Sequence, residues 1–230
     1  MNQSVERRAV LLGGTGLIGS HLLALLAARS EYTQVTVITR RSMPMPSDRC
    51  RNVVIPLTEL DQARDAFAGA DVFCCLGTTI KQAGSRDAFR QVDFDFVVEA
   101  ARLTASEGGK RFICVSAVNA DAGALAFYAR VKGEMEQTVQ QSDIPVIAFM
   151  QPSLLQGERA DFRLGEEVGQ RVLALVRPLT AWSKAAWLPI DASTVAHAMV
   201  SVAMNDSLEG VHRYRYRDMT DLADRVNQEE

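Results

Sequence analysis

Residues 9–19, with the sequence Ala-Val-Leu-Leu-Gly-Gly-Thr-Gly-Leu-Ile-Gly, decide the fold of this protein. The apolar run 9–12 ends in glycine, which is typical of a buried central strand in a parallel sheet. Apolar residues then recur at helical spacing from Leu17 to Arg29, and this spacing predicts the first helix. The stretch therefore predicts a strand, a glycine-rich turn and a helix, the context that gives a glycine pattern meaning.

The turn itself predicts a site for the pyrophosphate of a dinucleotide. Gly13 permits a tight turn, Gly16 lets a phosphate approach the main chain, and Gly19 lets the helix pack closely on the sheet. The amides and the dipole at the helix start attract an anion. The alternative is a tight turn without a ligand. The candidate cofactor-binding residues here are Gly13, Thr15, Gly16, Leu17, Ile18 and Gly19.

The remaining sequence alternates short apolar runs with helical stretches, which is typical of a parallel sheet with crossover helices. We predict further strands at 35–39, 53–55, 71–76, 111–115, 145–150 and 211–217, and helices at 60–67, 85–107, 127–141 and 193–204. The fold class is therefore α/β, a doubly wound parallel sheet (Rossmann fold), in one domain spanning 1–230. Residues 153–190 do not follow this alternation of strands and helices, and they are predicted to cover a substrate. Only the polar tail, 227–230, suggests disorder.

Composition limits the classes of function. A net charge of −3 does not suit a nucleic-acid-binding surface, which needs clustered Lys and Arg. Arg7-Arg8 before the apolar stretch 9–28 allows a signal peptide as an alternative, but the glycine spacing favours the phosphate turn. No other stretch suggests a membrane span. The four cysteines show no Cys-x-x-Cys spacing and the three histidines are scattered. We therefore expect reduced thiols, no metal site and a cytoplasmic protein.

The end of the second predicted strand indicates which dinucleotide binds. A carboxylate at that position would bind the adenosine ribose hydroxyls and favour NAD. This sequence has Arg40 and Arg41 instead, and arginine suits the 2′-phosphate of NADP. The sequence therefore favours NADP(H) over NAD(H). The alternative is a solvated pair of surface arginines.

Tyr128 and Lys132 lie four residues apart on a predicted helix and so share a face. A phenol has a pKa near ~10, and a nearby ammonium lowers it towards the range useful for acid–base chemistry. Such a tyrosine could exchange a proton with a carbonyl or alcohol while a nicotinamide carries the hydride. The alternative is a packed tyrosine beside an exposed lysine.

Together these features resemble the short-chain dehydrogenase/reductase superfamily, and within it the atypical branch that contains the Tat-interactive oxidoreductase-like proteins. The resemblance covers nearly the whole chain. The segments that carry it are 13–19, Cys74-Cys75-Leu76-Gly77-Thr78-Thr79, Val92-Asp93-Phe94-Asp95, Tyr128-Ala129-Arg130-Val131-Lys132-Gly133-Glu134, 151–153, 157–159 and 195–199.

The resemblance implies roles for several residues. Leu76, Gly77 and Thr78 would line the adenosine and pyrophosphate side, Lys132 would also bind the nicotinamide ribose, and Pro152 would lie beside the nicotinamide ring. Ser116 would belong to the catalytic serine segment.

The chain departs from the family pattern at two points. Superfamily members usually carry two or more hydroxyls after the fifth strand, but Ser116 is followed here by Ala117 and Val118. Ser116 is therefore either catalytic or only the end of the strand. Gln151 replaces an arginine found in many relatives. Asp93 is predicted either to anchor the wall of the site or to be solvated.

Three functions follow from the sequence. The first is an NADP(H)-dependent oxidoreductase for a carbonyl or alcohol. Tyr128 would be its acid–base residue, Lys132 would lower the pKa of Tyr128, and Ser116 could orient the substrate. The second is a regulatory protein that binds NADP(H) without catalysis. The third, an isomerase or dehydratase with tightly held cofactor, ranks last because the short C-terminal region leaves little room for a nucleotide sugar. Both a monomer and a homodimer remain open.

Overall fold

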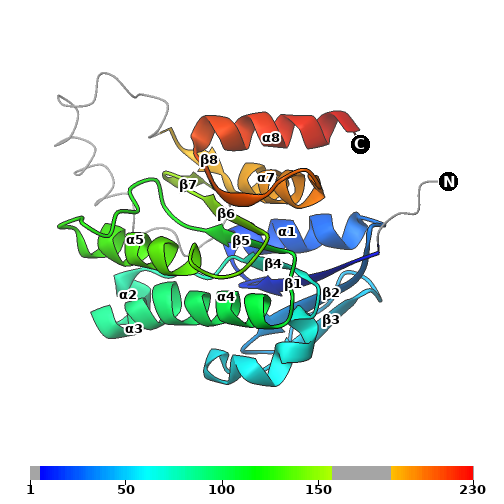
Figure 1. The fold of residues 1–230 in the computed structure, drawn as a ribbon, viewed down its shortest axis with the longest axis horizontal. Helices are drawn as coiled ribbons and strands as arrows, with labels where there is room; N and C mark the ends of the chain where they lie inside the picture. The colour runs from blue at the N-terminus through cyan, green and yellow to red at the C-terminus, as the bar shows by residue number, and fades with distance from the viewer. Residues whose placement is uncertain (1–5, 157–187, 230) are drawn as a thin grey trace.

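In a computed structural model, which describes residues 6–156 and 188–229, a parallel sheet forms the centre of the protein (Figure 1). Its strand order is β3-β2-β1-β4-β5-β6-β9, and every neighbouring pair is parallel. The strands are β1 (Arg7–Leu12), β2 (Tyr32–Thr39), β3 (Cys50–Val54), β4 (Asp71–Cys74), β5 (Arg111–Val115), β6 (Val146–Met150) and β9 (Gly210–Tyr214). The predicted doubly wound α/β fold is confirmed.

Helices cover both faces of the sheet (Figure 1). One face carries α1 (Leu17–Ala28) and α7 (Ala192–Met204), with α8 (Tyr216–Glu229) packed against α7; the other carries η1 (Leu57–Phe67), α4 (Phe96–Ser106) and α5 (Phe127–Val139). β1 shows how the sequence divides the core. Ala9 and Leu11 pack with the α1 and α7 side, whereas Val10 and Leu12 pack with the η1 and α4 side, because alternate strand residues point to opposite faces.

The strand order places a topological switch point at the carboxyl ends of β1 and β4. The chain first moves outward from β1 through β2 to β3 and then crosses to β4 on the other side of β1. The connections that follow β1 and β4 therefore diverge, and ligands of open α/β sheets bind at this switch point.

The segment predicted as one helix, 85–107, is divided. It contains α3 (Arg86–Arg90), the π-helical turn η2 (Gln91–Asp95) and α4, and it is preceded by the short helix α2 (Ile80–Ala83). Ser85 caps α3 by accepting a hydrogen bond from the amide of Ala88. Because a π turn adds a residue to the helical repeat, such turns change which side chains face the core.

The end of the chain also differs from the prediction. The last strand is β9, which ends at Tyr214, and α8 follows it at once. The suggestion of disorder for 227–230 is therefore wrong for 227–229, which continue α8. Most of the predicted covering segment, 153–190, lies outside the described residues. Its two ends pair as the short strands β7 (Leu155–Gln156) and β8 (Ile190–Asp191).

The start of the described chain excludes the signal-peptide interpretation for 9–28. Residues 9–12 belong to β1, which lies between β2 and β4, and Val10, Leu11 and Leu12 are fully buried. The helix expected over 17–29 is confirmed as α1.

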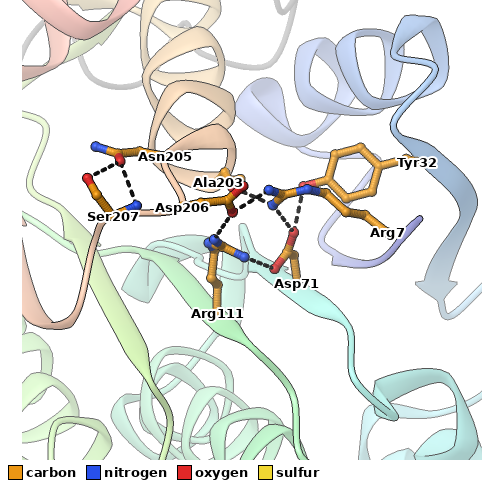
Figure 2. Close-up of polar contacts among 8 residues, drawn as sticks. All are labelled: Arg7, Tyr32, Asp71, Arg111, Ala203, Asn205, Asp206 and Ser207. Atoms are coloured by element: carbon orange, nitrogen blue, oxygen red, sulfur yellow. Dashed lines mark hydrogen bonds and ion pairs between the residues drawn. The ribbon is translucent and has the colours of Figure 1, made fainter. Parts of the chain in front are cut away.

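An ion-pair network lies at the amino-terminal edge of the sheet (Figure 2). Arg7 of β1 and Arg111 of β5 both contact the buried Asp71 of β4, at 3.3 and 3.0 Å, and Tyr32 donates to the same carboxylate at 2.9 Å. Asp206, after α7, accepts from both arginines, at 2.5 and 2.7 Å. The network therefore ties four strands, β1, β2, β4 and β5, to the loop that follows α7.

Candidate functional site

The glycine-rich turn lies where β1 ends and α1 begins, at the switch point of the sheet. Gly16 is the N-terminal cap of α1, and no side chain occupies the cap position. The first turn of α1 also carries no acidic residue. Since the first amides of a helix have no acceptor within the helix, they are available here to an anion.

The turn is shaped so that side chains are excluded from it. A Cβ on Gly19 would lie 2.2 Å from the carbonyl oxygen of Gly13, and a Cβ on Gly13 would lie 2.5 Å from that of Cys75. Gly13 also has a φ of 80°, in the left-handed region. Thr15, at the tip of the turn, is exposed. The main chain is therefore bare where a pyrophosphate would bind, and the residues fit a dinucleotide.

Arg40 and Arg41 directly follow β2, whose carboxyl end lies beside that of β1. Both are exposed, and neither forms an ion pair with the residues that the structure describes. Their turn is fixed by Asn52 of β3, which donates to Thr39 Oγ1 at 2.7 Å, and by Thr39, which donates to the carbonyl of Arg41 at 2.7 Å. The backbone that carries the two arginines is thus held at the carboxyl end of β2, beside the end of β1.

The segment after β4 lies on the other side of the switch point. Leu76 is buried, while Gly77 is exposed and Thr78 is partly exposed. The amide of Thr78 donates to Asp93 Oδ2 at 2.9 Å. A Cβ on Gly77 would lie 3.5 Å from Asp93 Oδ1 and 4.0 Å from Lys132 Nζ. The bare backbone of Gly77 therefore covers a charged pair.

That pair is formed by Lys132 of α5 and Asp93 of the π turn. Lys132 Nζ lies 2.8 Å from Asp93 Oδ1, and the two side chains are 3% and 1% exposed. Burial is the largest influence and opposes the charge on Lys132, but Asp93, Tyr128 and Cys114 together outweigh it and raise the pKa of Lys132 above its usual value, so the ammonium persists at neutral pH. Of the two interpretations of Asp93, anchoring is confirmed and solvation is excluded.

Tyr128 lies one helical turn before Lys132 on α5. Its residue surface is 42% exposed, and its ring packs on Phe89 of α3 at 5.6 Å between centroids. Partial withdrawal from water raises the pKa of the Tyr128 phenol, Lys132 opposes the rise and Asp93 adds to it. The residue is therefore partly open to solvent, and its phenol is protonated at neutral pH.

Ser116, at the end of β5, is buried and donates to Glu136 Oε1 at 2.5 Å. Glu136 of α5 also accepts from Gln151 Nε2 at 2.9 Å and from Arg213 Nε at 2.8 Å. No hydrogen bond joins Ser116 to Tyr128 or Lys132 among the described residues. The hydroxyl hydrogen of Ser116 is thus directed towards the interior of the protein.

Pro152 follows β6 and is buried, and its carbonyl accepts from the amide of Val118 at 3.1 Å. This contact holds the segments after β5 and β6 side by side at the carboxyl edge of the sheet. Among the described residues no group of three His, Cys, Asp or Glu is placed to hold a metal ion.

The sequence analysis missed two residues that organise this region. Glu136 and Arg213 lie 77 positions apart, so they form no local sequence motif. The spacing of Lys132 and Glu136, four residues apart on a helix, could have placed Glu136 on the inner face of α5. Nothing in the sequence around Arg213 indicated its partner.

Comparison with known proteins agrees with this geometry. Residues 13–177 match the family model described as NAD(P)H-binding. Protein HTATIP2 of Rattus norvegicus is 32% identical over 200 residues, which cover 85% of this chain and 81% of that protein. Protein FMP52-1, mitochondrial, of Scheffersomyces stipitis is 29% identical over 224 residues, covering 93% of this chain and 97% of that protein.

A solved structure with a similar fold is the UDP-glucuronic acid 4-epimerase of Bacillus cereus in complex with NAD. It aligns with a TM-score of 0.64 and 16% identity, over 90% of this chain and 78% of that chain. At this identity the likeness shows the fold alone.

The expectation of a cytoplasmic location is wrong, because fungal relatives named FMP52 are mitochondrial proteins. The expectation rested on cysteines that are reduced, and all four are free in the structure. Free thiols fit any reducing compartment, so they do not identify one. No helix among the described residues has the length and hydropathy to cross a membrane.

Proposed function

This chain belongs to the NAD(P)H-binding family, and from that premise we propose that it is an NADP(H)-dependent oxidoreductase acting on a carbonyl or alcohol. The family relationship also confirms the resemblance to the Tat-interactive oxidoreductase-like branch of the short-chain dehydrogenases/reductases. The observation that carries the proposal is the placement of Tyr128 one helical turn from a charged, buried Lys132 on α5, with the ammonium of Lys132 lying against the bare backbone of Gly77.

The proposed cofactor site consists of three parts. The turn Gly13, Thr15, Gly16, Leu17, Ile18 and Gly19 would hold the pyrophosphate through main-chain amides. Leu76, Gly77 and Thr78 would line the adenosine and pyrophosphate side. Lys132 would bind the nicotinamide ribose and Pro152 would lie beside the ring. The close backbone contacts of Gly13 and Gly19 support this assignment, because any side chain there would displace the turn.

The preference for NADP(H) over NAD(H) is proposed from Arg40 and Arg41. They are exposed, lie at the end of β2, and have no carboxylate partner among the described residues. Two uncommitted guanidinium groups attract a doubly charged phosphate but not ribose hydroxyls. No acidic residue occupies the last position of β2, where Thr39 stands instead.

Calorimetry can test this preference. We expect the double variant Arg40→Ala/Arg41→Ala to weaken NADPH binding by at least about tenfold, since charge-assisted hydrogen bonds are worth ~1.5–3 kcal/mol. NADH binding should change by less than about threefold, because its ribose carries no phosphate. Arg217→Ala, an exposed arginine on α8, is the matched control. Equal losses for both dinucleotides would contradict the assignment.

In the proposed reaction, Tyr128 provides the proton. When bound, the reduced nicotinamide supplies a hydride to the carbonyl carbon. Tyr128 donates its phenolic proton to the carbonyl oxygen, and the ammonium of Lys132 stabilises the phenolate that remains. Ser116 could orient the alcohol by accepting its hydroxyl hydrogen, but it cannot donate to the carbonyl oxygen, because its own hydrogen is given to Glu136.

Tyr128→Phe tests the catalytic assignment. The variant should lose turnover while NADPH affinity stays within about twofold, since the phenol is assigned to proton transfer and not to the cofactor. Tyr216→Phe, on α8, is the control for removal of a hydroxyl elsewhere. Equal turnover in Tyr128→Phe and the unchanged protein would refute the role.

A second candidate function is a regulatory protein that binds NADP(H) and signals through a partner. One observation favours it: the hydroxyl hydrogen of Ser116 points to Glu136, and the next two residues, Ala117 and Val118, have no hydroxyl. A turnover screen with NADPH and a panel of aldehydes, ketones and quinones separates the two functions. Tight NADPH binding without turnover on any of them would favour the regulatory protein.

A further inference from the structure

The turn that follows β2 is held by a residue of the neighbouring strand. Asn52 lies on β3, paired with Val37 of β2. Its side-chain nitrogen donates to the carbonyl of Val37 at 3.0 Å and to Thr39 Oγ1 at 2.7 Å. Its side-chain oxygen accepts from the main-chain amide of Met43 at 3.0 Å. One side chain thus joins the end of β2 to the far side of the turn formed by residues 40–42.

Thr39, the last residue of β2, extends this connection to the arginines. Its side chain lies in a residue that is only 7% exposed. The hydroxyl accepts from Asn52 and gives its own hydrogen to the carbonyl of Arg41 at 2.7 Å. A buried hydroxyl with two hydrogen bonds restricts the chain around it, because breaking either bond leaves a polar group without a partner. The hydrogen bonds therefore run from β3 through Thr39 to Arg41.

The same hydrogen bonds lie on the face of the sheet that carries the phosphate turn. Alternate residues of a strand point to opposite faces, so Val37 and Thr39 share a face. Val37 belongs to the core that packs with α1. A Cβ on Gly14 would lie only 2.7 Å from Val37 Cγ1, so the phosphate turn rests on β2 two residues before Thr39. The turn 40–42 is therefore anchored to the strand that supports the phosphate turn.

We propose that Asn52 and Thr39 are positioning residues for dinucleotide specificity, which hold the turn 40–42 in one conformation so that Arg40 and Arg41 meet the 2′-phosphate of NADP(H). This inference rests on the proposed preference for NADP(H). Long charged side chains lose freedom when they bind, and a backbone that is already fixed reduces this cost. NADH carries no 2′-phosphate, so its binding should depend little on either residue.

A similar hydrogen bond on the opposite face of the same two strands provides a matched control. Arg51 of β3 donates to Thr36 Oγ1 of β2 at 3.0 Å. Thr36 is also buried, at 2% exposure. Because Thr36 is three positions before Thr39, its side chain points to the other face of the sheet. Thr36→Val therefore removes a link between β2 and β3 without touching the bonds that hold the turn 40–42.

The test compares the affinities of the variants for NADPH and NADH by calorimetry. Asn52→Ala and Thr39→Val should each weaken NADPH binding by at least about fivefold, because the two arginines must then be ordered on binding. NADH binding should change by less than about twofold, since it has no phosphate for them to contact. Thr39→Ser keeps the hydroxyl and should keep the preference. Thr36→Val should leave the ratio of the two affinities unchanged.

A second measurement needs no cofactor. Hydrogen exchange of the main-chain amides of residues 41–43 reports how firmly the turn is held. Exchange at the Met43 amide should be faster in Asn52→Ala than in the unchanged protein, because this amide loses its acceptor. Thr36→Val should exchange there at the rate of the unchanged protein. Unchanged exchange at Met43 in Asn52→Ala would show that the turn is held without Asn52, and would overturn the inference.

The binding results separate failure of this inference from failure of the proposed function. Equal affinity of the unchanged protein for the two dinucleotides would overturn the proposed cofactor preference, and the inference with it. A preference that is present in the unchanged protein and survives in both Asn52→Ala and Thr39→Val would overturn the inference alone. Equal changes of the ratio in Thr39→Val and Thr36→Val would do the same. The pair Thr39→Val and Thr39→Ser decides the matter if Asn52→Ala does not fold.

Discussion

The stability of the sheet should depend on Asp71 far more than on its neighbour in the same network, Asp206. The Asp71 side chain is 3% exposed and contacts two arginines that are each 11% exposed, whereas Asp206 is 68% exposed. Asp71→Asn removes the charge and places amide hydrogens against the donors Arg7, Arg111 and Tyr32. Water cannot easily reach the groups that are left.

The size of the effect follows from this enclosure. Removing one partner of a buried ion pair costs ~3–5 kcal/mol. Asp206 still accepts from both arginines, so we expect the lower end, about 3 kcal/mol. For a domain of this size each kcal/mol lowers Tm by ~2–4 °C, which gives a decrease of roughly 6–12 °C. Asp206→Asn should cost about 1 kcal/mol or less, because solvent screens an exposed pair.

Urea unfolding at pH 7, followed by far-ultraviolet circular dichroism, measures both free energies. Asp65→Asn, on the exposed side of η1 and outside the network, controls for the loss of one negative charge. The reasoning fails if Asp71→Asn loses no more stability than Asp206→Asn. It also fails if the Asp65 control loses as much as Asp71→Asn.

Three further predictions concern other parts of the protein. Desolvation opposes the charge on Asp206, but Arg7 and Arg111 together lower the pKa of this carboxyl. The stabilisation by Asp206 is therefore present above the unfolded pKa and is lost as the pH falls through the lower folded pKa. In unfolding measurements, the stability difference between Asp206→Asn and the unchanged protein should shrink from pH 7 to pH 3. Gly19→Ala should weaken NADPH binding by at least about tenfold in calorimetry, because its Cβ would lie 2.2 Å from a carbonyl oxygen, while Gly123→Ala, where the nearest atom is 3.5 Å away, should leave affinity intact. Glu136→Gln should lower the free energy of unfolding by ~1–3 kcal/mol, because its new amide group would face Ser116, Gln151 and Arg213, which all donate to the Glu136 carboxylate. Glu99→Gln, on the exposed side of α4, should leave the free energy of unfolding unchanged.

The parts of the site that the sequence predicted are those built from neighbouring residues. The turn 13–19 depends on a strand, glycines and a helix that follow one another directly, and local sequence is enough to define such a unit. Tyr128 and Lys132 share a helix face by spacing alone. Arg40 and Arg41 were placed by the end of a β-branched strand, and the strand does end at Thr39.

The division of the long helix could not be predicted in the same way. The apolar spacing over 85–107 was interpreted with a constant helical period, but the π turn 91–95 inserts an extra residue into it. α8 was also missed, because the expected last strand was extended to 217, beyond the true end of β9 at Tyr214.

The sequence by itself determined the fold class, the phosphate turn and the pairing of a phenol with an ammonium, because each depends on local order or on regular spacing. Only the tertiary structure decided the electrostatic state of that pair. Asp93 is brought to Lys132 across 39 positions by the packing of the π turn against α5, and Glu136 takes the hydroxyl hydrogen of Ser116 across 20. Burial and distance control the strength of a charge, and both arise only when distant segments pack together.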